Sequence, residues 1–129
     1  MNAHLRIARP VSILRRSAAM YKTALGFQEV GAFDDHDGFD GVILARPGKC
    51  FHLEFTHCRT RQAKPSPTPE DLLVFYLPDA AAAATTCEAM LESGFVEVAP
   101  FNPYWGQHGR TFEDPDGYSV VVQNASWPE

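Results

Sequence analysis

Cysteine is scarce in this sequence, and no two cysteines form a CxxC pair. The 129 residues contain Cys50, Cys58 and Cys87, an odd number at scattered positions. A disulfide framework uses an even number of cysteines and persists mainly in oxidising compartments. We therefore expect free thiols and a cytoplasmic protein.

Long apolar runs and clusters of basic residues are also missing. No apolar run approaches the roughly 20 residues that a helix needs to cross a bilayer. The N-terminal segment lacks the apolar core of a signal peptide. The net charge of −5 comes without a basic patch, which is the electrostatic footprint of nucleic-acid binders. Neither a membrane nor a nucleic acid is therefore an expected partner.

Familiar catalytic patterns are absent as well. The sequence shows no Ser-His-Asp or Cys-His spacing and no glycine-rich phosphate loop. Its hydrophobic fraction of 45% is ordinary for a globular protein, and 129 residues suffice for one domain. Evidence on function must therefore come from the fold and from individual polar positions.

The clearest structural signal lies near the C-terminus, at residues 111–124 (TFEDPDGYSVVVQN). Asp114-Pro115-Asp116-Gly117 is strong turn chemistry, because proline presets φ, aspartate caps the turn and glycine accepts a positive φ. The β-branched run at 120–122 suits a buried strand. This stretch predicts a β-hairpin.

An internal repeat extends this signal to the whole chain. Residues 26–30 (GFQEV) reappear as residues 94–98 (GFVEV), an offset of 68 residues (94 − 26). At the same offset Pro10 matches Pro78 and Pro47 matches Pro115. Self-similarity in one register indicates two halves of the same design.

Hydrophobic periodicity and turn residues predict the same order of elements in each half. Ser12 and Asp79 are the expected helix N-caps. The first module, 1–58, should contain strands at 4–10, 27–33, 39–45 and 50–57 and a helix at 13–25. A proline-containing linker at 59–71 should lead to the second module, 72–129, with strands at 72–77, 95–98, 110–113 and 118–124, a helix at 80–92 and an irregular aromatic loop at 101–108. The tail at 125–129 has no clear assignment.

Two βαβββ units joined by a proline linker resemble the vicinal oxygen chelate superfamily, which includes glyoxalase I, bleomycin-resistance proteins and extradiol dioxygenases. The most specific pieces are Leu14…Tyr21…Leu25-Gly26-Phe27 and residues 112–118 (FEDPDGY). The resemblance covers about residues 5–124. It implies an α+β fold in which each module curls its sheet into a half-open barrel and the two modules form a ligand-binding cleft. It also implies a homodimer.

In the metal-dependent members of this superfamily, four side chains from the first and last strands of each unit hold one divalent metal. By the resemblance, these positions fall here on Arg6, Glu54, Leu73 and Val121, or on Val122 if the repeat register is kept. Glu54 alone has a lone pair to give, and a catalytic metal site needs about three protein ligands. We therefore expect neither the usual metal site nor another cofactor.

A rebuilt site remains an alternative. His52 and Glu54 share one face of their strand by the period of two, and His4 shares a face with Arg6. His4, His52 and Glu54 could form a two-histidine, one-carboxylate set for a divalent metal. His52 could instead be half-buried and hydrogen-bonded within the sheet, or it could contact a ligand beside Glu54. Arg6 and Glu54 could also simply satisfy each other as an ion pair.

Further ligand-binding candidates lie in the second half. Asn102, Tyr104 and Trp105 could wall a pocket for an organic molecule, or could cover the barrel mouth or a dimer interface. Tyr76 is a polar exception within an apolar strand, so we expect it to line a pocket. Arg110 could meet an anionic ligand or remain a solvated charge.

Two functions follow from these observations. The first is a metal-free protein that binds a small organic molecule in the cleft between the modules. The alternative is an enzyme, either a metal-dependent lyase or dioxygenase with a rearranged site at His52 and Glu54 or a metal-free acid–base catalyst that uses these two side chains.

Overall fold

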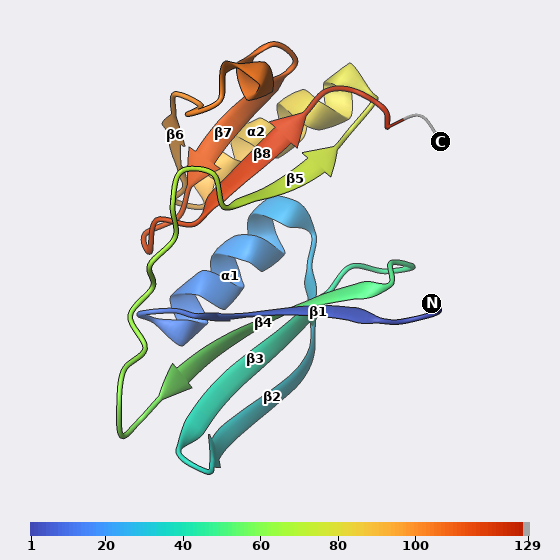
Figure 1. The fold of residues 1–129 in the computed structure, drawn as a ribbon. Coiled ribbons are helices and arrows are strands. Elements are labelled where there is room, and N and C mark those ends of the chain that lie inside the picture. The colour runs from blue at the N-terminus through green and yellow to red at the C-terminus, as the bar shows by residue number, and fades with distance from the viewer. Residues whose placement is uncertain (128–129) are drawn as a thin grey trace. The chain divides into compact units, whose positions relative to one another are not determined.

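The computed structural model describes residues 1–127, and its contacts divide the chain into two compact units, Met1–Pro65 and Ser66–Glu129 (Figure 1). Each unit contains one α-helix and a mixed four-stranded sheet. Neither sheet closes into a barrel on itself. The α+β fold with two βαβββ modules is therefore confirmed.

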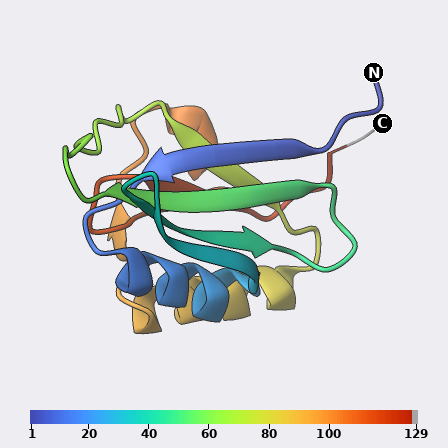
Figure 2. The same cartoon turned by 90° about the horizontal axis from the view of Figure 1, so that it is seen from below.

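Unit 1 has the strand order β1-β4-β3-β2. β1 pairs with β4 in parallel, and the other pairings are antiparallel. Figure 2 shows α1 lying along one face of this sheet. The elements are β1 (Leu5–Pro10), α1 (Leu14–Leu25), β2 (Gln28–His36), β3 (Phe39–Ala45) and β4 (Phe51–Cys58).

Helix α1 joins the sheet through its apolar stripe. Tyr21 is fully buried and packs edge-to-face on Phe55 of β4, with ring centroids 4.9 Å apart. Burial of each such aromatic side chain stabilises the fold by about 2–3 kcal/mol. Gly26 ends the helix at φ 73°, in the left-handed region that glycine adopts at low cost. The expected Ser12 cap is wrong, because Ile13 holds the N-cap position and makes no side-chain capping bond.

Unit 2 repeats this arrangement with the order β5-β8-β7-β6, in which β5 pairs with β8 in parallel. Asp79 caps α2 as expected, since its Oδ2 accepts a hydrogen bond from the Ala82 amide at 3.1 Å. The elements are β5 (Leu72–Tyr76), α2 (Ala80–Glu92), β6 (Val96–Val98), the 3-10 helix η1 (Pro103–Gly106), β7 (Gly109–Glu113) and β8 (Ser119–Gln123).

The turn between β7 and β8 forms as its sequence predicts. Asp114 Oδ1 accepts hydrogen bonds from the amides of Asp116 at 2.9 Å and Tyr118 at 3.0 Å. Gly117 has φ 90°, which a residue with a side chain rarely adopts. The backbone of this turn is therefore held by the aspartate that begins it.

The loops differ from expectation at two places. β2 continues to His36, and its pairing with β3 shifts register between Phe33 and His36. The loop expected to be irregular at 101–108 contains η1, which Asn102 caps through its side chain. All three cysteines are free, as expected. No helix in residues 1–127 is both long enough and apolar enough to span a bilayer.

Candidate functional site

Strand β4 presents a polar face on the side of its sheet away from α1. Leu53 and Phe55 are fully buried, and Phe55 contacts the helix. The alternate residues His52 and Glu54 are half-buried and share the other face, as the period of two predicts. The parallel pairing places Arg6 of β1 directly beside His52.

Arg6 binds both of these side chains. Its Nη1 donates to Glu54 Oε1 at 3.1 Å, and its Nη2 lies 3.3 Å from His52 Nδ1. The side chain of Glu54 is only 17% exposed, against 46% for Arg6. A carboxylate removed from water in this way needs a partner, and the guanidinium supplies one.

The same contact fixes the hydrogen-bonding state of His52. A guanidinium only donates, so Nδ1 must accept and the neutral ring carries its proton on Nε2. Loss of hydration, and then the positive charge on His4 and Arg6, lowers the pKa of His52 from its usual value. The rings of His4 and His52 meet at an angle with centroids 4.0 Å apart. At neutral pH, His52 is therefore an uncharged imidazole with an N–H donor on Nε2.

This cluster is poorly arranged for metal binding or for general base catalysis. The lone pair that neutral His52 could give to a metal or a proton is already directed at Arg6. Glu54 is neutralised by the same guanidinium. Within residues 1–127, no group of three or more histidine, cysteine, aspartate or glutamate side chains could hold a metal ion. The cluster instead offers fixed donors and one paired carboxylate to a polar ligand.

In unit 2 the corresponding positions are apolar, with one exception. The repeat matches Ala8 with Tyr76, and strand pairing joins Ala8 to Glu54 and Tyr76 to Gln123. Gln123 is therefore the structural counterpart of Glu54. It is only 2% exposed, and its Oε1 has no hydrogen-bond partner in the described part of the chain.

Sequence reasoning missed Gln123 because the repeat offset of 68 residues matches Glu54 with Val122, whereas strand pairing matches it with Gln123. Leu73 and its partner Val120 lie on the face covered by α2. Val74 and its partner Val121 lie on the opposite face, which also carries Gln123. One feature of the sequence could have identified Gln123: it is a polar residue that follows a run of three valines at the end of its strand. Gln123 lies over Gly109, where any side chain would collide with its amide.

The other ligand-binding candidates of the second half lie on β5, at η1 and on β7. Tyr76 is half-buried on β5, with its ring centroid 6.0 Å from that of Trp127. Asn102 Oδ1 accepts from the Tyr104 amide at 3.0 Å and so begins η1. Tyr104 and Trp105 pack edge-to-face at 4.9 Å. Asn102 thus has a structural role, and the two aromatic rings contact each other.

Arg110 lies on the α2 face of its sheet, opposite to the face that carries Gln123. Its guanidinium binds Glu97 through two hydrogen bonds of 2.9 and 2.7 Å and lies 5.4 Å from the centre of the Phe112 ring. These hydrogen bonds, with a further interaction with Cys87 of α2, raise the pKa of Arg110. The guanidinium is therefore already engaged by a carboxylate.

Comparison with known sequences gives one consistent result. The family model of the YycE-like N-terminal domain matches residues 5–56, and that of the YycE-like C-terminal domain matches residues 70–124. The uncharacterised protein YycE of Bacillus subtilis (strain 168) is 40% identical over 123 residues, which cover 95% of this chain and 88% of that protein.

Solved structures agree with this relationship. The crystal structure of a Bacillus subtilis YycE protein of unknown function, a candidate glyoxalase/fosfomycin resistance protein, is 38% identical with a TM-score of 0.91, covering 98% of this chain and 93% of that chain. Glyoxalase I of Leishmania major is 17% identical with a TM-score of 0.73, covering 97% of this chain and 88% of that chain. At 17% identity the likeness shows the fold alone.

Proposed function

The chain belongs to the YycE-like family of the vicinal oxygen chelate superfamily, and from this premise we propose that it binds a small organic molecule without a metal ion. The observation that carries the proposal is the contact of Arg6 with both Glu54 and His52. A fixed cation holds the two side chains that a divalent metal would need. The cluster is suited to recognise a ligand rather than to activate water.

The proposed ligand carries hydrogen-bond acceptors on an organic frame. The Nε2–H of His52 is a donor set by the contact on the other side of the ring. Arg6 keeps donors beyond the two that it uses, and its side chain is 46% exposed. A carbonyl or carboxylate of the ligand could accept from both residues, because charge-assisted hydrogen bonds of this kind are among the stronger ones.

A thermal-shift screen of small organic molecules tests this function, because a ligand that binds the native state raises its stability by mass action. Each hit is titrated with and without a chelator against wild type, His52→Gln and Glu54→Gln. The matched control is His57→Gln, which changes a histidine on the opposite face of the same strand. We expect binding to survive the chelator and the control and to weaken in the other two variants. Hits that bind all four proteins alike would contradict the proposed site.

We also propose that the protein assembles as a homodimer. β1 and β2 form the edges of one sheet, and β5 and β6 form the edges of the other. Leu5 and Val96 on these edges are 58% and 63% exposed. Unpaired edge strands favour association unless something covers them. Light scattering at micromolar concentration should give twice the mass of one chain, and the mass of a single chain would count against the dimer.

A further inference from the structure

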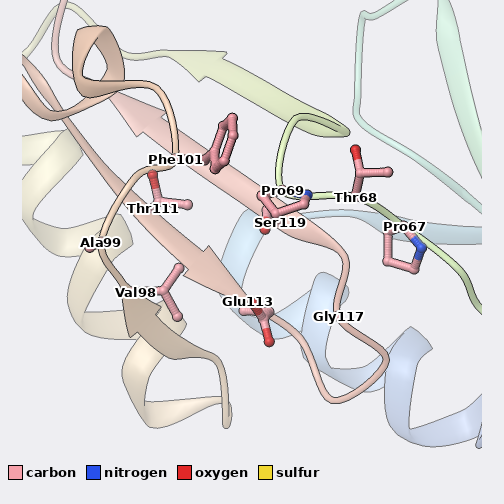
Figure 3. A pocket seen from close by; sticks show the side chains of 10 residues that line it. All are labelled: Pro67, Thr68, Pro69, Val98, Ala99, Phe101, Thr111, Glu113, Gly117 and Ser119. Carbon is pink, nitrogen blue, oxygen red and sulfur yellow. The ribbon is translucent and has the colours of Figure 1, made fainter.

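Unit 2 contains a pocket of about 440 Å³ that involves none of the residues of the Arg6 cluster (Figure 3). Its floor is the sheet face opposite α2, where Thr111 and Glu113 of β7 and Ser119 of β8 lie side by side. Strand pairing joins Glu113 directly to Ser119. The pocket therefore rests on paired strands, which hold their side chains at fixed spacings.

One wall of the pocket comes from the segment before β5. A Cβ added to Gly117 would meet Cγ of Pro67 at 3.4 Å, so Pro67 lies close over Gly117. The Thr68 amide and hydroxyl both donate to Asp71 Oδ2, at 2.7 and 2.8 Å, and the Asp71 amide donates to the Thr68 carbonyl at 3.0 Å. These bonds fix the conformation of the turn at residues 68–71, which includes part of this wall. The pocket is thus preformed, as small-molecule sites generally are.

The other side of the pocket is apolar and aromatic. Val98 of β6 and Phe101 of the following loop line it, and Phe101 is 66% exposed. An aromatic side chain left this open costs free energy through its contact with water, and a bound apolar group would relieve part of that cost. This wall indicates a ligand with a hydrocarbon or ring portion.

The charge of the pocket restricts its ligand further. Among the described residues that line it, Glu113 is the one that is charged. A carboxylate repels an anion, and a single carboxylate is too few ligands for a protein metal site. An ammonium group pairs with a carboxylate through charge-assisted hydrogen bonds. Glu113 therefore favours an organic cation.

Thr111 adds a hydroxyl without a partner. The residue is 4% exposed, and its Oγ1 makes no hydrogen bond within the described residues. Thr111 is one of the residues that line the pocket. A ligand that hydrogen-bonds to it would satisfy a polar group that the fold leaves unpaired.

We propose that this pocket of unit 2 binds a small organic amine. The ammonium group pairs with Glu113, the hydrocarbon part lies against Phe101 and Val98, and Thr111 accepts a hydrogen bond from the amine or a neighbouring hydroxyl. This inference goes beyond the function proposed for unit 1. The proposed amine site and the Arg6 cluster share no residues, so an experiment can disprove either proposal without affecting the other.

Three probes of similar size, each with one phenyl ring, test the proposal: 2-phenylethylamine, 2-phenylethanol and phenylacetate. Each is titrated into the ¹⁵N-labelled full-length protein, and amide shifts are followed by NMR. We expect the amine to shift the amides of Thr111, Glu113 and Ser119 and to bind about fivefold more tightly than the alcohol, as an exposed ion pair allows. Phenylacetate should bind least.

Two variants assign the preference to particular groups. Glu113→Gln should remove the advantage of the amine over the alcohol, while Glu88→Gln, an exposed carboxylate on α2 that gives the same change in net charge, should preserve it. Thr111→Val should weaken the binding of the amine and of the alcohol to the same extent. Equal binding of all three probes, an amine preference that survives Glu113→Gln, or no amide shifts on β7 and β8 would each overturn the proposal. Shifts confined to Arg6, His52 and Glu54 would do so as well, while leaving the function proposed for unit 1 in place.

Discussion

Arg6 and Glu54 face each other from neighbouring parallel strands, with Nη1 of the arginine 3.1 Å from Oε1 of the carboxylate. The same guanidinium reaches His52 on its other side. One cation thus organises the polar face of the first sheet and leaves the imidazole as a neutral donor. The function proposed above depends on this arrangement.

Removal of the Arg6 charge should change how His52 titrates. The pKa of His52 is lowered first by loss of hydration and then by positive charge on His4 and Arg6. Arg6→Gln removes one of these charges, so we expect the pKa to rise part of the way toward its usual value. An NMR titration of the His52 ring measures this, with Arg16→Gln on α1 as the control. A pKa that is unchanged or lower in Arg6→Gln would contradict the contact.

The lowered pKa of His52 also has a consequence for stability. The folded state favours the neutral ring, so the unfolded state binds a proton more readily. The contribution of His52 to the free energy of unfolding is therefore fully present above the unfolded pKa near 6.5. It is lost as pH falls through the lower pKa of the folded state. In Arg6→Gln the folded pKa should lie closer to the unfolded one, so this loss of stability should be smaller and should be complete at a higher pH. Denaturant unfolding as a function of pH measures both effects.

The protein should be more stable when an apolar residue of similar shape replaces Gln123. Its buried Oε1 has no hydrogen-bond partner within residues 1–127. Gln123→Met removes an unsatisfied acceptor, so we expect the free energy of unfolding to rise by about 1 kcal/mol. Gln28→Met, at an exposed position of β2, should change it by less than about 0.5 kcal/mol. A loss of stability in Gln123→Met would mean that the amide is satisfied in solution.

Gly41 should be intolerant of any side chain. It pairs directly with Phe33, and an added Cβ would run into the Phe33 ring. Gly41→Ala should therefore lower the free energy of unfolding by about 1–3 kcal/mol, as overpacking of a core does. Gly31→Ala is the control, because a Cβ there would meet Ile43 only at 3.4 Å, an ordinary contact. Equal effects of the two substitutions in denaturant unfolding would exclude the Phe33 packing.

Local chemistry made most of the fold predictable. The turn at Asp114–Gly117, the glycine after α1 and the Asp79 cap are each set by residues within a few positions, and all three form as expected. The boundaries of β2 and the cap of α1 were less predictable. The register shift depends on how β2 pairs with β3, which no local pattern records. The N-cap of α1 carries no capping side chain that a sequence pattern could identify.

The candidate site was predictable only where it follows strand alternation. The shared face of His52 and Glu54 required only the period of two. The part played by Gln123 depended on a one-residue difference in strand pairing between the two units, which the constant repeat offset concealed. Arg110 was predicted either to meet an anionic ligand or to remain a solvated charge, and its engagement by Glu97 depends on β6 and β7 lying side by side.

Metal content is the measurement that decides between the binding function and the metal-dependent alternative. Protein purified without added metal or chelator is analysed by plasma mass spectrometry, together with Glu54→Ala. Because Arg6 already holds Glu54 and His52, we expect no divalent metal near one equivalent per chain in either protein. Near-unit zinc, nickel, iron or manganese in the wild type, lost in Glu54→Ala, would contradict this expectation and show a metal site that includes Glu54.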